Sequence, residues 1–287
     1  MALGILVCRI MNVKLAETLG FCFGVRDAIA AAERAASAGE LTVLGEIVHN
    51  PVVQKRLTGL GVNARSLSDV EAPTKRVLIT PHGAAQQDLR RWSENGYIVL
   101  DATCPLVRRT HQQLARLVSE GVHPVIIGDR HHVEVLGLAG DCPEATIVNS
   151  EDEVELLPLA ERYGIVSQTT QQIDRVRQIV EKVRSTFPNS DVHFVDTVCQ
   201  PTKSRQSALT KLFQGVEAMV VIGGRNSHNT RQLVEASRKQ GLPTLHVETV
   251  DDLTPDWFDD FETVGITAGA STPPDVIDAV RTRLESL

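Results

Sequence analysis

The sequence predicts an α/β protein with three pseudo-repeated α/β domains, whose mostly parallel sheets surround a central metal centre. Two observations carry this prediction. Short apolar runs typical of buried strands alternate with longer segments of helical periodicity along the whole chain. Three of the five cysteines, Cys22, Cys104 and Cys199, each follow such a run and precede a helix-like segment of about four turns. We interpret them as three thiolates that converge on one centre.

Composition and charge exclude several classes of protein. A chain of 287 residues with 42% hydrophobic and 23% charged residues is ordinary for a globular protein with a large core. A net charge of −7 argues against a nucleic-acid binder, and no apolar run approaches the ~20 residues of a membrane span. The apolar start at residues 1–10 lacks the features of a signal peptide, and Met11 is an alternative start. An odd number of cysteines fits a reducing compartment better than a disulfide framework, so we expect a cytoplasmic protein.

The elements are expected in three successive blocks, in which apolar strands end in polar loops ahead of helices. In the block of residues 11–96, strands are expected at 13–16, 42–47 and 77–80, with helices at 25–37 and 84–95 and a helix start at Pro51. In the block of residues 97–190, strands are expected at 97–100, 124–128 and 163–166, with helices at 106–120 and 173–186. In the block of residues 191–287, strands are expected at 192–195, 218–222 and 264–267, with helices at 204–213, at 230–240 and from 273.

The blocks have the spacing of an internal repeat. A first polar loop follows each cysteine by 27 or 28 residues, and a second follows it by 60 to 72 residues. The carboxyl ends of parallel strands are where open α/β sheets bind their ligands. We therefore expect one shared site rather than coincidence. The residues at these loop positions are His49 and His82, His132 and Thr169, and Ser227 and Ser271.

Three cysteines without a fourth equivalent predict a metal site with an open coordination position. Soft thiolate ligands select zinc, copper(I) or iron–sulfur clusters. A structural zinc site normally has four ligands, and an iron–sulfur cluster with only three would leave one iron free for substrate. A position at a helix N-terminus favours the thiolate. Cys8 and Cys142 fall outside the repeat, and we interpret them as bystanders.

The polar loops together predict an anion pocket. Imidazolium, hydroxyl and amide groups beside helix N-termini are the donors that phosphate groups require. The glycine-rich segments 223–229 and 265–271 resemble phosphate cradles, although neither is a Walker A sequence. The number of donors favours a diphosphate ester as the ligand. The side chains expected to grip it are His49, His82, His132, Ser227, His228, Asn229 and Ser271.

Glu134 is the one carboxylate among these loops. A glutamate beside a metal and a desolvated anion can have a raised pKa and deliver protons. Thr169, on a neighbouring loop, could orient or relay that proton. The remaining histidines, His111 among them, lie within or at the edges of regular elements, and we interpret them as non-functional.

Eight stretches resemble the 4-hydroxy-3-methylbut-2-enyl diphosphate reductases, which complete the methylerythritol phosphate route to isoprenoids. They occur in the family's order from about residue 13 to the C-terminus. They are Gly20-Phe21-Cys22-x-Gly24-Val25, His49-Asn50-Pro51, Pro81-His82-Gly83, Asp101-Ala102-Thr103-Cys104-Pro105, Ser167-Gln168-Thr169-Thr170, Asp196-Thr197-x-Cys199, Asn226-Ser227-x-Asn229 and Thr267-Ala268-Gly269-Ala270-Ser271.

The resemblance implies a [4Fe–4S] cluster held by Cys22, Cys104 and Cys199, with an open apical iron that binds the substrate's hydroxyl. Two electrons and protons would remove that hydroxyl as water and give isopentenyl and dimethylallyl diphosphates. Residues matching Glu134 and Thr169 serve proton transfer in the family. Those matching His49, His82, His132, Ser227, Asn229 and Ser271 grip the diphosphate.

The sequence departs from the family pattern in two functional loops. His131 precedes His132 where the family commonly has glycine, and the spacing to Glu134 favours His132 as the site residue. His228 stands where many members have serine, which leaves its contact with the anion open.

Electrons would come from a separate carrier of the ferredoxin or flavodoxin type, because no G-x-G-x-x-G motif follows a strand. Three other functions were weighed: a quinolinate synthase, a non-catalytic cluster carrier, and a zinc hydrolase that uses His49, His82 and His132. The first acts on carboxylates rather than diphosphates. The second has no need of a dedicated anion pocket.

Overall fold

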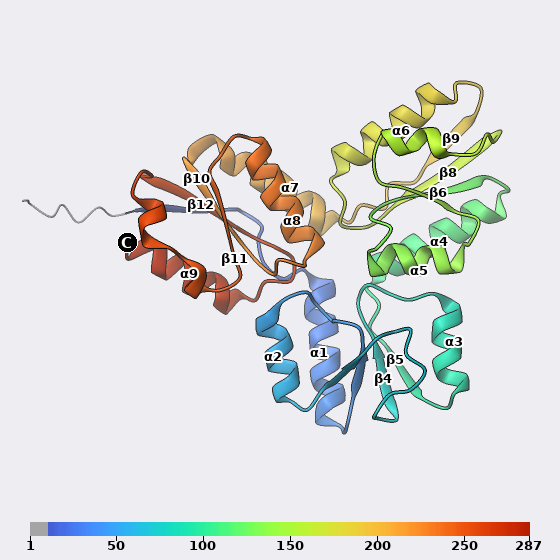
Figure 1. Ribbon diagram of the computed structural model, residues 1–287, viewed down its shortest axis with the longest axis horizontal. Coiled ribbons are helices and arrows are strands. Elements are labelled where there is room, and N and C mark those ends of the chain that lie inside the picture. The colour runs from blue at the N-terminus through green and yellow to red at the C-terminus, as the bar shows by residue number, and fades with distance from the viewer. Residues whose placement is uncertain (1–10) are drawn as a thin grey trace, which may run out of the picture. The chain divides into compact units, whose positions relative to one another are not determined.

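The computed structural model describes residues 11–287 and consists of parallel sheets flanked by helices, which form two compact units (Figure 1). The two-sheet unit comprises residues 22–48 and 52–203, and the one-sheet unit comprises residues 11–21, 49–51 and 204–287. All strand pairs in the three four-stranded sheets of the described chain are parallel. The predicted α/β class with three parallel sheets is confirmed. Cys8 and the apolar start lie outside the described residues.

The first sheet of the two-sheet unit has the strand order β3-β2-β4-β5. Helix α3 packs Trp92 against Val77 and Ile79 on one face, and in Figure 1 helix α1 lies on the other side of β4. The alanine-rich sequence of α1 favours a helix and buries Ala28 and Ala32. The elements are α1 (Phe23–Ser37), β2 (Thr42–Leu44), α2 (Pro51–Gly59), β3 (Asn63–Arg65), β4 (Arg76–Ile79), α3 (Gln86–Glu94) and β5 (Ile98–Asp101).

The second sheet of this unit has the equivalent order β7-β6-β8-β9. Ile126 and Val166 pack against α4 and α5, whereas their neighbours Val125 and Ile165 pack against α6. Alternate residues of each central strand therefore serve opposite helical layers, as in a parallel sheet buried on both faces. The elements are α4 (Pro105–Ser119), β6 (His123–Ile127), α5 (Val133–Asp141), β7 (Thr146–Val148), η1 (Asp152–Leu156), β8 (Arg162–Ser167), α6 (Ile173–Thr186) and β9 (Asp191–Phe194).

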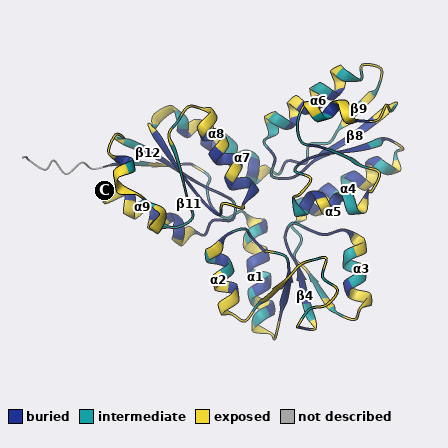
Figure 2. Ribbon diagram, viewed as in Figure 1, coloured by how far each residue is buried: buried dark blue, intermediate teal, exposed yellow. Residues whose placement is uncertain are grey.

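The one-sheet unit repeats the pattern in the order β11-β10-β12-β1. All five residues of β10 are buried, and Met219 and Val221 pack with Leu209 of α7 and Leu233 of α8. Figure 2 shows buried strands inside each unit and exposed outer sides of the helices. The elements are β1 (Asn12–Leu15), α7 (Gln200–Leu212), η2 (Phe213–Gly215), β10 (Ala218–Ile222), α8 (His228–Lys239), β11 (Thr244–Val247), η3 (Val250–Asp252), η4 (Pro255–Phe258), β12 (Thr263–Ala268) and α9 (Pro274–Glu285).

Each cysteine of the repeat follows an edge strand of a sheet: Cys22 follows β1, Cys104 follows β5 and Cys199 follows β9. The strands β5 and β9 pair with β4 and β8 of the preceding block, and β1 pairs with β12 at the other end of the chain. The expected boundaries at residues 97 and 191 therefore lie just before β5 and β9, and each of these strands pairs with a strand of the preceding block. An apolar run in the sequence does not show which strand it will pair with. The division into three domains at residues 11–96, 97–190 and 191–287 stays a prediction.

Two tight contacts join the two halves of the two-sheet unit. A Cβ atom added at Gly140 of α5 would lie 2.7 Å from the Cβ of Ala85, and one at Gly137 would lie 3.4 Å from the backbone of Ala84. The absence of side chains at these glycines lets α5 approach the start of α3 closely. No helix among residues 11–287 combines the length and hydropathy that a membrane span requires.

Candidate active site

The three cysteines of the repeat all belong to the two-sheet unit and stand at helix N-termini. Cys22 and Cys104 are the N-cap residues of α1 and α4, and Cys199 directly precedes α7. Pro105 at the first position of α4 fixes the backbone there and has no N–H to satisfy. Each cysteine therefore lies between a strand and a helix, as the sequence predicts.

A glycine lets two of the cysteine loops approach each other. A Cβ atom at Gly24, two residues after Cys22, would lie 2.6 Å from the Sγ of Cys104, too close for any side chain. Burial is the main cause that raises the pKa of Cys104 and of Cys199, and the charge of Cys22 raises both further.

Burial keeps two of the thiols in their neutral form. It raises the pKa of Cys104, although the backbone N–H groups of Leu106 and Val107 pull the pKa down. Burial likewise raises the pKa of Cys199 to about 11, against a hydrogen bond with Thr202, whose Oγ1 lies 3.1 Å from Sγ. For both thiols, the effect of burial on the pKa outweighs the hydrogen bonds that lower it, so the neutral form is favoured near pH 7.

The three thiols are soft donors, the type that zinc, copper(I) and iron–sulfur clusters select. Among residues 11–287, no group of three or more His, Cys, Asp or Glu side chains is arranged so that it could hold a metal ion.

Glu134 is buried at the start of α5, with 1% of its surface exposed. Thr169 donates to both carboxylate oxygens, from its backbone N to Oε1 at 2.7 Å and from its Oγ1 to Oε2 at 2.9 Å. Burial raises the pKa of Glu134 to about 7, although the two Thr169 hydrogen bonds and the charge of His111 lower it. The carboxyl group is therefore poised to hold or release a proton near neutral pH.

Two candidate histidines, His132 and His82, contact each other in the same unit as Glu134. His132 is the N-cap of α5, and its Nδ1 accepts a hydrogen bond of 3.2 Å from the backbone N of Glu134. Its ring meets that of His82 edge-on, with centroids 5.6 Å apart. The neighbouring His131 is exposed.

The remaining candidates form a second group, in the one-sheet unit. Ser227 caps α8 by accepting a hydrogen bond from the Thr230 backbone N at 3.4 Å, and its Oγ lies 3.4 Å from that of Ser271. Asn229 Oδ1 accepts a hydrogen bond of 2.9 Å from the backbone N of Ala270. The loops after β10 and β12 are thereby joined at one helix N-terminus, where backbone N–H groups attract anions.

His49 and His228 also belong to this second group. The carbonyl oxygen of His49 faces Gly224 so closely that a Cβ atom there would lie 1.9 Å from it. This contact brings the loop after β2 against the loop after β10. His228 is buried in the first turn of α8, and its Nε2 lies 3.4 Å from the Gln232 side chain.

Thr230 has a buried hydroxyl with no hydrogen-bond partner among the described residues. A Cβ atom at Gly269 or at Gly223 would lie 2.1 or 2.6 Å from this hydroxyl, so both loops need glycine. The φ angle of Gly223 is +145°, which also disfavours other residues. These contacts explain the glycines of both predicted phosphate-binding segments.

His111 pairs with Asp141 in the two-sheet unit. The Nδ1 of His111 lies 2.7 Å from Oδ2 of Asp141. The sequence does not reveal this contact, because the two residues lie 30 positions apart. The interpretation of His111 as non-functional stays a prediction.

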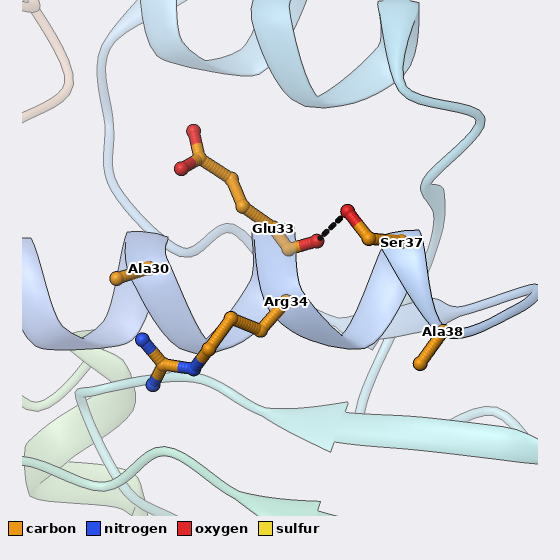
Figure 3. A pocket seen from close by; sticks show the side chains of 5 residues that line it. All are labelled: Ala30, Glu33, Arg34, Ser37 and Ala38. Atoms are coloured by element: carbon orange, nitrogen blue, oxygen red, sulfur yellow. Dashed lines mark hydrogen bonds between the residues drawn. The ribbon is translucent and has the colours of Figure 1, made fainter.

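An open hollow of about 520 Å³ runs along α1 beyond Cys22 (Figure 3). Its lining includes small side chains and Arg34, and the Oγ of Ser37 donates to the Glu33 carbonyl at 2.9 Å. The Glu33 carboxylate pairs with Arg56 at 2.7 Å. None of the candidate site residues lines this hollow, and we assign it no role.

Comparison with known proteins gives a match over almost the whole chain. A family model described as "LytB protein" matches residues 13–285. A protein of Aquifex aeolicus named 4-hydroxy-3-methylbut-2-enyl diphosphate reductase is 35% identical over 283 residues, which cover 96% of this chain and 97% of the relative. A protein of the same name from Geobacter sp. strain M21 is 39% identical over 280 residues, with 96% and 98% covered.

Solved structures agree with these relatives. The E-1-hydroxy-2-methyl-but-2-enyl-4-diphosphate reductase of Plasmodium falciparum is 28% identical, with a TM-score of 0.87 over 95% of this chain and 87% of that one. A second structure, described as (E)-4-hydroxy-3-methyl-but-2-enyl diphosphate reductase, the terminal enzyme of the non-mevalonate pathway, is 34% identical. Its TM-score is 0.70, over 96% of this chain and 100% of that one.

Proposed function

The chain belongs to the LytB protein family, and from that premise we propose that it reductively dehydroxylates 4-hydroxy-3-methylbut-2-enyl diphosphate to isopentenyl and dimethylallyl diphosphates. Its membership makes it a reductase, like the relatives that carry that name. The observation that carries the finer proposal is the buried Glu134–Thr169 pair in the same unit as three thiols at helix N-termini.

Cys22, Cys104 and Cys199 would hold a [4Fe–4S] cluster. When bound, such a cluster supplies low-potential electrons and, at an iron without a protein ligand, a Lewis acid for the hydroxyl oxygen. Gly24 keeps the space beside Cys104 Sγ clear of a side chain. Because metal ligands must be deprotonated, cluster binding would release a proton from the buried Cys199 thiol, whose pKa burial raises to about 11.

Glu134 supplies the proton that the departing hydroxyl needs. With a pKa of about 7, the carboxyl group retains a proton near neutral pH and can still give it up. Thr169 fixes the plane of the carboxyl group through its N–H and O–H donors. A solvated glutamate would be ionised at this pH and would be a poor acid.

The diphosphate is bound by the remaining polar loops. Ser227, Asn229 and Ser271 lie around the N-terminus of α8, where backbone N–H groups and the helix dipole favour an anion. His49 and His228 in that unit add ring N–H donors. The substrate's charge, rather than its short carbon chain, would provide most of the binding energy.

The electrons are proposed to come from a separate protein of the ferredoxin or flavodoxin type, because the sequence carries no nicotinamide or flavin motif. The cytoplasm remains the proposed compartment, since the three ligand thiols must stay reduced to bind the cluster.

Anaerobic turnover tests this function directly. The protein is purified without oxygen, its iron and sulfide are measured, and a reduced dye is mixed with 4-hydroxy-3-methylbut-2-enyl diphosphate. We expect a brown protein with about four irons and four sulfides that oxidises the dye and releases both isoprenoid diphosphates. A colourless zinc protein that hydrolyses the diphosphate would instead support the hydrolase. A brown protein without turnover would support a cluster carrier, and turnover of carboxylates alone would support a quinolinate synthase.

A further inference from the structure

The loop 223–229 of the candidate diphosphate site is held from outside by the end of β11. The backbone N of Gly223 donates a hydrogen bond of 2.9 Å to the carbonyl oxygen of Val247. The carbonyl oxygen of Gly223 lies 2.8 Å from Nε2 of His246, on the same strand. Both backbone polar groups of Gly223 are therefore engaged by β11, in the one-sheet unit that also contains Ser227.

Glu248, the residue directly after β11, holds the next part of this loop. Its Oε1 accepts a hydrogen bond of 2.8 Å from the backbone N of Arg225, and its Oε2 lies 4.0 Å from Nε of the same residue. The Arg225 side chain is 60% exposed, so the ion pair contributes little and the backbone hydrogen bond is the main contact. The charge of a carboxylate beside an anion site would oppose binding, so the loop that it holds explains its place best.

Nε2 of His246 is the donor of its contact, since the carbonyl oxygen of Gly223 can only accept. Burial is the main cause that lowers the pKa of His246, and the charges of Arg225 and Arg238 lower it further. The hydrogen bond with Gly223 and the charge of Glu248 oppose this shift of the pKa. The ring is therefore neutral near pH 7, with its one proton on Nε2, and the contact does not require a charged ring.

The backbone contact at the start of the loop recurs in the other two sheets of the described chain. In each sheet, the glycine directly after a central strand donates its N–H to the carbonyl oxygen of the last residue of the neighbouring edge strand. The first candidate anion-binding residue of each repeat follows this glycine by four positions. The pairs are Gly45–Arg65 at 2.7 Å, Gly128–Val148 at 3.0 Å and Gly223–Val247 at 2.9 Å, ahead of His49, His132 and Ser227. An edge strand thus sets the start of each candidate loop.

The loop after β6 also has a glutamate contact. Arg130, two residues after the glycine that follows β6, pairs at 2.7 Å with Glu153 of η1, beyond the edge strand β7. Arg225 stands two residues after the glycine that follows β10 and is held by Glu248, beyond the edge strand β11. In both sheets, a glutamate beyond the edge strand therefore contacts the same position of the loop.

We propose that His246 and Glu248 are positioning residues that hold the loop 223–229 in the conformation that receives the diphosphate. The φ angle of Gly223 is +145°, and glycine is conformationally free, so contacts from outside must select this conformation. The selected conformation places Ser227 at the N-terminus of α8. The inference rests on the proposed function, in which this loop binds the diphosphate. The sequence indicated no role for His246, because the residue lies inside a strand.

Binding of inorganic diphosphate to the cluster-loaded protein, measured by calorimetry, tests the role of His246. We expect His246→Leu to bind it about threefold to tenfold more weakly, the effect of one lost hydrogen bond, and to raise KM similarly with less change in kcat. His246→Gln should bind within about twofold of wild type, because the glutamine amide can place an N–H near the position of Nε2. The matched control is His123→Leu, which removes a partly buried strand histidine whose Nε2 lies 2.9 Å from Thr146 Oγ1. This control should lose stability without a change in diphosphate binding.

Two replacements of Glu248 separate its hydrogen bond from its charge. Glu248→Gln keeps an oxygen that accepts from the Arg225 backbone N and removes the negative charge, so diphosphate should bind as tightly as to wild type or more tightly. Glu248→Ala has no acceptor and should bind about threefold to tenfold more weakly. The control is Glu235→Ala, at an exposed position of α8 in the same unit, which should bind like wild type.

Hydrogen exchange of the full chain gives a measurement without ligand. We expect the peptide that covers residues 223–229 to exchange faster in His246→Leu and Glu248→Ala than in wild type or the two glutamine variants, because a looser loop opens more often. Unchanged exchange or unchanged diphosphate binding in both of these variants, or glutamine variants that bind as weakly, would overturn the proposal. A wild type that binds diphosphate and shows these differences, but does not turn over the substrate, would count against the proposed function alone.

Discussion

At the scale of single residues, Glu134 owes its acid strength to two opposing influences. Burial of the carboxyl group favours the neutral form, whereas the N–H and O–H of Thr169 favour the ionised form. Burial prevails, but the two hydrogen bonds keep the pKa near neutrality at about 7. Either influence alone would leave a carboxyl group that is always charged or one that never releases its proton.

Replacement of Glu134 by glutamine should abolish most turnover without emptying the site. Glutamine keeps the volume and the hydrogen bond from Thr169 but carries no acidic proton. We expect kcat to fall by about 10²–10⁴-fold, the usual contribution of a general acid. Iron content and diphosphate binding, measured by metal analysis and calorimetry, should be retained. Glu144→Gln, at an exposed position, is the control, and undiminished turnover in Glu134→Gln would remove this residue from the mechanism.

The same carboxyl group should make stability depend on pH. Its folded-state pKa of about 7 lies above the ordinary value of 4.5, so the folded protein binds the proton more tightly. The associated stabilisation is complete below pH 4.5 and is lost as the pH rises to about 7, in total roughly 3 kcal/mol. Thermal unfolding of wild type and Glu134→Gln should be measured between pH 5 and 8. We expect the melting temperature of wild type to fall relative to that of Glu134→Gln as the pH rises. Parallel curves would contradict the raised pKa.

Gly24 is expected to be required for cluster binding rather than for the helix. Alanine would favour the helix by up to ~1 kcal/mol, but its Cβ would lie 2.6 Å from Cys104 Sγ. We expect Gly24→Ala to lose most of its iron. Gly59→Ala, in α2, is the matched control, because nothing lies within 4 Å of the added Cβ and iron content should not change. An equal iron content in both variants would show that the Cys104 loop can move aside for the added methyl group without losing the cluster.

At the scale of elements, the N-terminus of α8 joins stability to binding. Ser227 caps this helix and also belongs to the candidate diphosphate site. Ser227→Ala should cost about 1 kcal/mol of stability and raise KM several-fold with less effect on kcat. Thr249→Ala removes the cap of η3, so it should lower the melting temperature without changing KM. An equal rise of KM in both variants would mean that substrate binding is weakened by the loss of overall stability rather than by the loss of the Ser227 hydroxyl.

Central strands and helices were predictable from the sequence because their side chains carry a clear apolar pattern. The expected strand 218–222 is β10 with the same bounds, and helix 173–186 is α6. The outer strands β3, β7 and β11 were missed. Of these, β3 exposes all three of its residues and β11 buries only Val247. A strand at a sheet edge needs few apolar side chains, so no hydrophobic run marks it.

At the scale of the whole molecule, the repeat spacing was enough to place the three cysteines at helix N-termini, but not to predict which strands pair. The strand β1 joins β12, more than 240 residues away in sequence, and no local pattern encodes that choice. The His111–Asp141 contact was hidden for the same reason, since it joins two helices 30 residues apart. Spacing along the chain thus predicts where strands end and helices begin, whereas long-range packing determines which strands and side chains meet.

The cluster ligands can be distinguished from the remaining described cysteine by stability as well as by iron. Cys142 is buried among Leu114 and Leu138, and burial raises its pKa to about 12, so it does not act as a thiolate. Cys142→Ser should keep its iron and lose about 1–3 kcal/mol of stability, because a hydroxyl replaces a thiol in an apolar core.

Cys104→Ser should lose the cluster, since iron prefers thiolate. Its melting temperature should fall below that of wild type only when the wild type is loaded, because a ligand stabilises only the fold that binds it. Melting curves of both variants and wild type, with and without iron and sulfide, check this difference. If both variants lost the same amount of iron, three cysteines would not form the centre.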